Sequence, residues 1–173
     1  MPLSLVTENR DLLPEPLAAA AGQPAGLGEH TALLRRRGLA RVTADGLQLH
    51  PVPAGLLIER TGGDHASDGG WTAIAVRLLR AAVPDRPAAE PDCWPSWRQL
   101  LPHVLAATDP ARQLDPVAGD VGWLLAQAGG YLEARGRSKS ARALLEDAYE
   151  FDVGARLRAF GESPVTPDQE QQP

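Results

Sequence analysis

Apolar residues in the first part of the chain occur in short runs separated by turn residues, and this pattern predicts short helices. Residues 11–21 predict a first helix, because prolines are tolerated in a first turn, and Gly22 ends it. Residues 27–37 predict a second helix that stops at Gly38, since glycine commonly follows the last turn of a helix.

A hairpin and a third helix are predicted next. Two β-like runs, residues 39–43 and 47–50, flank Ala44-Asp45-Gly46. Asp-Gly between such runs is a strong hairpin signal, because glycine adopts the positive φ that the turn needs. The apolar pattern then continues into a helix that ends near Arg60. Helix, helix, two-stranded wing and helix is the outline of a winged helix, which we assign to residues 1–62.

The middle of the chain, residues 63–117, predicts a linker followed by a helical spacer. Residues 61–70 hold four glycines and no large apolar residue, which is typical of a linker or mobile loop. Apolar residues at helical spacing then predict helices over residues 71–83 and 96–107.

Two further helices, residues 117–134 and 138–151, are predicted to close the ordered part of the chain. Residues 156–173 are predicted to form a disordered tail. From Gly161 onward the only large apolar residue is Val165, so burial of apolar side chains cannot offset the entropy lost on ordering. The predicted fold class is therefore mainly α, with one small β-hairpin.

Composition and charge narrow the function classes. The net charge of -5 does not provide the strong positive field that is typical of nucleic-acid-binding proteins, although a local basic patch is compatible with it. A single cysteine, Cys93, excludes an internal disulfide framework and a cysteine-rich zinc module. No secretory signal and no apolar run of about 18 residues is visible, so we expect a cytoplasmic protein.

The final helix pair, residues 118–155, resembles a tetratricopeptide repeat. Such a repeat needs small residues where its two helices pack closely, and Gly129, Ala141 and Ala148 match those positions. Residues 122–155 then span one unit, with Gly136 in the turn. The larger apolar positions are taken by Leu125, Leu132 and Leu145.

Two positions depart from the repeat pattern, because Ser138 replaces the usual aromatic residue and Val153 replaces the usual proline. In the register of the resemblance, Trp123, Gly130 and Glu133 lie on the concave face of the first helix, where repeat proteins hold peptides. The resemblance thus implies a protein-binding site at these three residues.

The order of segments over residues 3–152 resembles a wider family. The stretches at residues 33–41, 46–50 and 94–103 are similar to the region after the ATPase core of bacterial STAND (NB-ARC-like) signalling NTPases. In that family a winged helix joins through a helical spacer to a tetratricopeptide array. The resemblance implies a non-enzymatic adapter that binds another protein, such as a STAND-type NTPase or a peptide.

The same resemblance places His50 where the family has a histidine that senses the nucleotide phosphate. Pro51 and Pro53 depart from the family pattern directly afterwards. A phosphate-binding loop needs G-x-x-x-x-G-K-[ST], but Lys139-Ser140 is preceded by Ser138 and lacks both glycines. We therefore expect no ATP hydrolysis and no cofactor, and we interpret His50 as a relic of the sensor.

One basic cluster suggests an alternative function. Arg35, Arg36, Arg37 and Arg41 on a winged helix could contact DNA phosphates, as in a transcriptional regulator. Arginines at a helix C-terminus also complement the helix dipole, and the chain as a whole is acidic. Nucleic acid is therefore the less favoured partner.

Other reactive side chains give no recognised site. Asp64, His65 and Asp68 lie in the glycine-rich loop, but their spacing fits no known metal site. Cys93 and His103 lack a third group that would orient them for nucleophilic catalysis. The sequence therefore favours an interaction protein over an enzyme.

Overall fold

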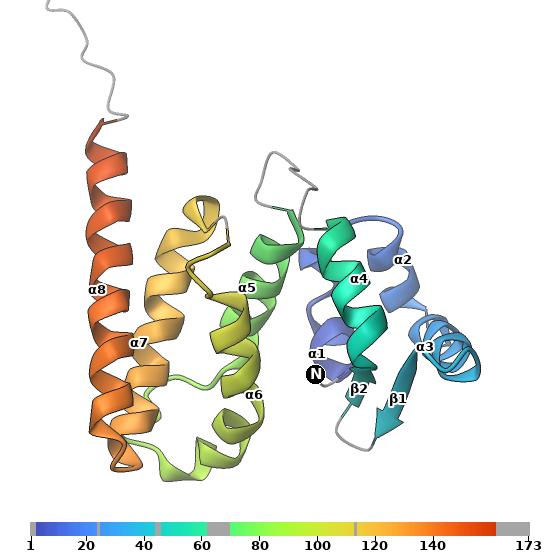
Figure 1. Cartoon of the computed structure of the whole chain (residues 1–173), viewed down its shortest axis with the longest axis horizontal. Helices are drawn as coiled ribbons and strands as arrows, with labels where there is room; N and C mark the ends of the chain where they lie inside the picture. Colours follow the sequence, from blue (N-terminus) through green and yellow to red (C-terminus); the bar gives the residue numbers. More distant parts are fainter. Residues whose placement is uncertain (1–2, 24, 44–45, 62–69, 113, 162–173) are drawn as a thin grey trace, which may run out of the picture.

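The computed structural model describes residues 3–23, 25–43, 46–61, 70–112 and 114–161. Over these residues the protein is mainly helical, with one two-stranded antiparallel sheet (Figure 1). The helices are α1 (Leu3–Glu8), α2 (Leu17–Gly22), α3 (Gly26–Arg36), α4 (Pro51–Thr61), α5 (Gly70–Ala82), α6 (Trp94–Ala107), α7 (Ala118–Ala134) and α8 (Ser138–Gly161). The strands are β1 (Ala40–Thr43) and β2 (Gly46–Leu49), and 3-10 turns cover Arg10–Leu12, Pro91–Cys93 and Asp115–Val117.

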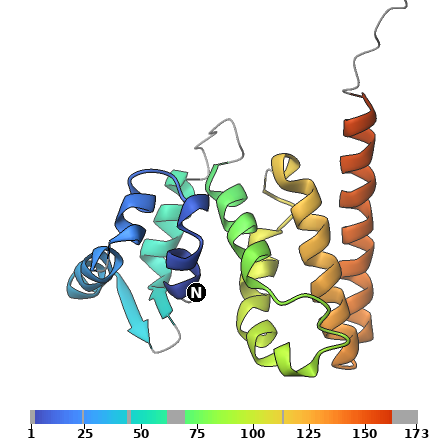
Figure 2. The same cartoon turned by 180° about the vertical axis from the view of Figure 1, so that it is seen from behind.

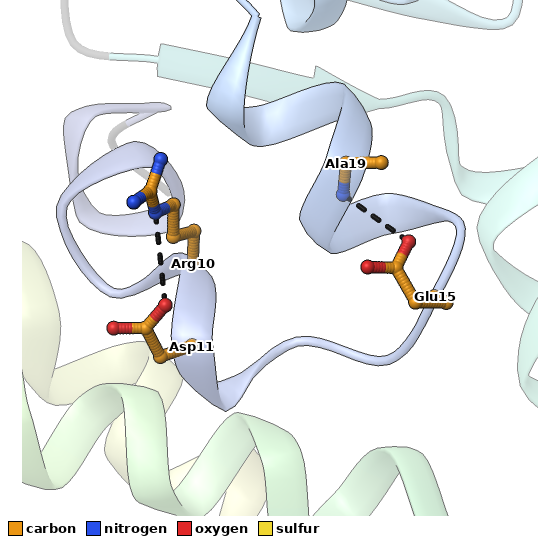
Figure 3. A network of polar contacts seen from close by, with 4 residues as sticks. All are labelled: Arg10, Asp11, Glu15 and Ala19. Carbon is orange, nitrogen blue, oxygen red and sulfur yellow. Dashed lines mark hydrogen bonds and ion pairs between the residues drawn. The ribbon is translucent and has the colours of Figure 1, made fainter.

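The first predicted helix, over residues 11–21, is wrong in its first half. Helix α2 begins only at Leu17, and Leu13 has an extended backbone with ψ 145°. A residue before a proline avoids the helical region, and Leu13 precedes Pro14. The carboxylate of Glu15 instead accepts the N–H of Ala19 at 3.3 Å, in the first turn of α2 (Figure 3). Helix α1 was not predicted.

The second helix and the hairpin are confirmed. Gly38 has φ +67°; its N–H donates to the carbonyl of Arg35, and the N–H of Leu39 donates to that of Leu34, each at 3.0 Å. This is the Schellman ending that a glycine after a helix favours. The strands pair from Ala40↔Leu49 to Thr43↔Gly46. Residues 44–45, which include Asp45 of the turn signal, lie outside the described residues.

The segment between α5 and α6 is held by tryptophan side chains. The indole N–H of Trp97 donates to the carbonyl of Pro84 at 3.0 Å, and that of Trp94 donates to Pro87 at 2.9 Å. Both rings contact Tyr131 of α7, where Trp97 stacks with centroids 5.8 Å apart. This aromatic cluster joins α6 to α7.

Helices α7 and α8 form the predicted hairpin, and its turn ends α7 in a second Schellman motif. Gly136 has φ +73°, and the N–H of Arg137 donates to the carbonyl of Leu132 at 2.8 Å. The helices approach closely at small residues: a Cβ added to Gly129 would lie 2.7 Å from Leu145 Cγ. The predicted end near residue 151 is wrong, because α8 continues to Gly161.

Residues 156–161 are therefore helical and do not belong to the predicted disordered tail, whose remaining residues, 162–173, lie outside the described part. Gly154 costs only about 1 kcal/mol in a helix and does not end one. An ion pair between Arg156 and Asp152, 2.9 Å apart, spans one turn of this extension.

The buried side chains form one cluster that extends from α1 to α8. Leu5 of α1 and Leu13 belong to the same core as Val76 of α5 and Val121 of α7. Helix α5 contacts α1 on one side and α6 and α7 on the other. The elements α2, α3, β1 and α4 lie at one end of the molecule and α8 lies at the other (Figures 1 and 2).

Candidate functional site

Two adjoining hollows lie between α7 and α8, and both are lined by Leu145 and Tyr149. The larger has a volume of about 500 Å³ and also involves Glu133. The smaller, of about 440 Å³, also involves Trp123. We call the combined feature the α7/α8 groove. Its lining residues are Gly119, Gly122, Trp123, Ala126, Glu133, Ser138, Ala141, Arg142, Leu145, Glu146, Ala148, Tyr149, Glu150 and Asp152.

Two apolar side chains that line this groove are exposed. Tyr149 is 70% exposed and Leu145 is 39% exposed, although Leu145 also packs across Gly129. The repeat resemblance gave the larger apolar positions to Leu125, Leu132 and Leu145. Leu125 and Leu132 are buried, whereas Leu145 is partly exposed. Exposed apolar side chains in a hollow are typical of a surface that binds another chain.

Most of the charged side chains that line the groove are acidic. Glu133, Glu146 and Glu150 are exposed, and none of them has an ion-pair partner in the described part of the chain. Glu146 and Glu150 lie one turn apart on α8, so their like charges repel each other. Arg142 is the one cation among the described residues that line the groove, which leaves the lining with an excess of negative charge.

Of the three residues that the resemblance assigned to peptide binding, two line the groove and one does not. Trp123 and Glu133 both line the α7/α8 groove. Gly130 is half-buried, and the nearest neighbour of an added Cβ would be Ala88, at 3.9 Å. The guanidinium of Arg80 lies 3.3 Å from the centroid of the Trp123 ring and covers one of its faces.

Sequence reasoning missed the α8 side of the groove, namely Leu145 as an exposed residue together with Glu146, Tyr149 and Glu150. A signal for it was present. Leu145 and Tyr149 are four residues apart, as are Glu146 and Glu150, so an apolar row and an acidic row run side by side along one helix.

The arginines proposed as DNA contacts gather at the other end of the molecule. Arg35 and Arg36 lie in the last turn of α3, Arg37 follows it and Arg41 is in β1. All four are exposed, and none forms an ion pair within the described residues.

His50 lies at the base of the hairpin, between β2 and α4. The backbone N–H of His50 donates to the carbonyl of Leu39, and the backbone carbonyl of His50 accepts the N–H of Ala54, both at 3.0 Å. The side chain is exposed. Pro51 and Pro53 are accommodated in the first turn of α4, where a missing N–H leaves no helical bond unmade.

Cys93 and His103 do not form a catalytic pair. Cys93 precedes α6, and ten residues of helix place His103 about 15 Å further along the axis. Burial raises the pKa of the Cys93 thiol, which disfavours the thiolate that a nucleophile requires. Burial also lowers the pKa of His103.

No group of three or more metal-ligating side chains occurs among the residues that the structure describes. Asp64, His65 and Asp68 lie outside them. Of the described helices, none has the length and apolar character needed to cross a bilayer. No protein-family model matches the chain, and searches of curated proteins and of solved structures found no match either.

Proposed function

We propose that this chain is a non-enzymatic protein-interaction module that binds a segment of another protein in the α7/α8 groove. The observation that carries the proposal is the exposed pair Leu145 and Tyr149 beside three carboxylates that have no ion-pair partner among the residues that the structure describes. Interfaces of this kind bury a few apolar and aromatic anchors within a charged rim. The resemblance to the regulatory region of STAND NTPases supports an adapter role in signalling.

The proposal predicts that Tyr149→Ala weakens binding of the natural partner at least about tenfold, because a buried aromatic anchor contributes more than ~1.4 kcal/mol. The measurement is a pull-down from the native cells, followed by titration of the protein that is enriched. Leu157→Ala is the matched control, since Leu157 is 67% exposed on the same helix but does not line the groove. Equal binding by both variants would place the interaction elsewhere.

The exposed arginines favour a second candidate, a DNA-binding regulator with a winged-helix domain. Arg36→Ala/Arg37→Ala should then weaken binding to duplex DNA and flatten its salt dependence, because each lost phosphate contact lowers the number of released counterions. The measurement is fluorescence anisotropy at several salt concentrations. Arg98→Ala/Arg112→Ala, at two other exposed arginines, is the control. No binding by the wild type at low salt would refute this candidate.

A further inference from the structure

The α7/α8 groove and the arginine end of α3 are complementary in charge. The described lining of the groove includes the carboxylates of Glu133, Glu146 and Glu150 and one guanidinium, that of Arg142. None of these carboxylates has an ion-pair partner in the described part of the chain. A cation placed between Glu146 and Glu150 would relieve the repulsion within this row.

The arginine end of α3 combines positive charge with an apolar side chain. Leu33 is 42% exposed, and Arg36 and Arg37 follow it by three and four residues, so all three lie on one side of the helix. Arg35 and Arg41 add to the charge at its edge. This surface therefore offers an apolar contact together with guanidinium groups, whose paired N–H donors match the two oxygens of a carboxylate.

These two surfaces cannot meet within one chain. The groove lies at one end of the molecule and the arginines lie near the other, with α5 and α6 between them (Figures 1 and 2). Within the described part of the chain, both surfaces therefore keep exposed apolar side chains and charges without ion-pair partners. A second copy would supply the missing partner to each.

We propose that the α7/α8 groove of one copy binds the arginine end of α3 of a second copy. In this contact Leu33 lies against Leu145 and Tyr149, while Arg36 and Arg37 approach Glu146 and Glu150. The contact is head-to-tail, so each bound pair leaves one free groove and one free arginine end, and the assembly can grow. The inference rests on the proposed function, because it names the occupant of the same groove.

The test is sedimentation velocity of the full chain at increasing concentration, in about 0.1 M salt, where charges act over ~10 Å. The wild type should associate above its single-chain mass of 18.4 kDa, and added salt should reverse the association. Arg36→Glu/Arg37→Glu and Glu146→Lys/Glu150→Lys should each weaken association at least about tenfold. All four positions are exposed, and circular dichroism checks that the variants fold.

The decisive experiment reverses the charges on both surfaces at once. A chain with all four substitutions, Arg36→Glu/Arg37→Glu/Glu146→Lys/Glu150→Lys, restores opposite charges across the contact and should associate again. Arg98→Glu/Arg112→Glu makes the same change of charge at two other exposed arginines and should leave association unchanged. Association that survives either pair of reversals, or that the fourfold variant does not recover, overturns the proposal.

A wild type that stays monomeric at every concentration also overturns the inference. The proposed function can be judged separately, because the loss of a cellular partner by Tyr149→Ala does not require self-association. If the wild type is monomeric and Arg36→Glu/Arg37→Glu abolishes DNA binding, the arginines serve DNA and not a second copy.

Discussion

Replacing Trp97 with alanine should lower the free energy of unfolding by about 4 kcal/mol. The side chain is 0% exposed, and its ring stacks on Tyr131 with centroids 5.8 Å apart. Its N–H also donates to the carbonyl of Pro84, which holds the segment between α5 and α6. The substitution removes the ring, leaves a cavity between α6 and α7, and frees that segment. A loss of this size is a large share of the stability of an ordinary domain.

The measurement is urea unfolding followed by tryptophan fluorescence and circular dichroism. Trp97→Phe separates the two contributions, because it keeps a ring against Tyr131 but removes the N–H that reaches Pro84. It should cost about 1–2 kcal/mol, the usual effect of an unmade hydrogen bond. Trp71→Ala is the control, since Trp71 is 43% exposed and should cost less than Trp97→Ala. A loss below 1 kcal/mol for Trp97→Ala would contradict the packing described for α6 and α7.

The second large effect is expected at Gly26, where α3 begins against α2. A Cβ at this position would collide with the carbonyl oxygen of Ala20 and lie 2.9 Å from its carbonyl carbon. The obstacle is backbone, so no side-chain rotation relieves it. Gly26→Ala should therefore lower the free energy of unfolding by about 3 kcal/mol, at the upper end of overpacking costs.

Gly28→Ala is a closely matched control for Gly26→Ala. Gly28 lies two residues further along α3, and a Cβ there would meet nothing within 4 Å. Alanine should then stabilise the helix by about 0.5–1 kcal/mol. Opposite signs for the two substitutions, measured by thermal unfolding and by hydrogen exchange of α2 and α3, are the expected result. Equal effects would mean that α2 and α3 do not approach as described.

Those elements whose signals are local in sequence were predicted well. The stops at Gly38 and Gly136 depend on a few neighbouring residues, because a Schellman ending is formed by the last turn and the glycine itself. Asp45-Gly46 and its flanking runs predicted the hairpin for the same reason. The apolar stripe of residues 71–83 predicted α5 to within one residue at each end.

The failures have equally specific causes. Residues 11–16 were joined to α2 because proline is tolerated in a first turn, but the residue before each proline disfavours helix. Helix α8 was predicted to end near residue 151, although no proline interrupts the chain before residue 164 and the helix continues to Gly161. The winged-helix and tetratricopeptide assignments, and the resemblance to STAND NTPases, remain predictions.

The candidate site shows the limit of the sequence most clearly. The sequence determined that residues 138–151 are helical and that Leu145, Glu146, Tyr149 and Glu150 share one side of that helix, because a 3.6-residue period fixes which side chains are neighbours. Only the tertiary structure decided that this side stays exposed. Whether another helix covers a given face depends on distant residues: Gly129 brings α7 against α8, and nothing in the described part of the chain packs over Tyr149. Helical period is a property of neighbouring residues, whereas burial is a property of the whole fold.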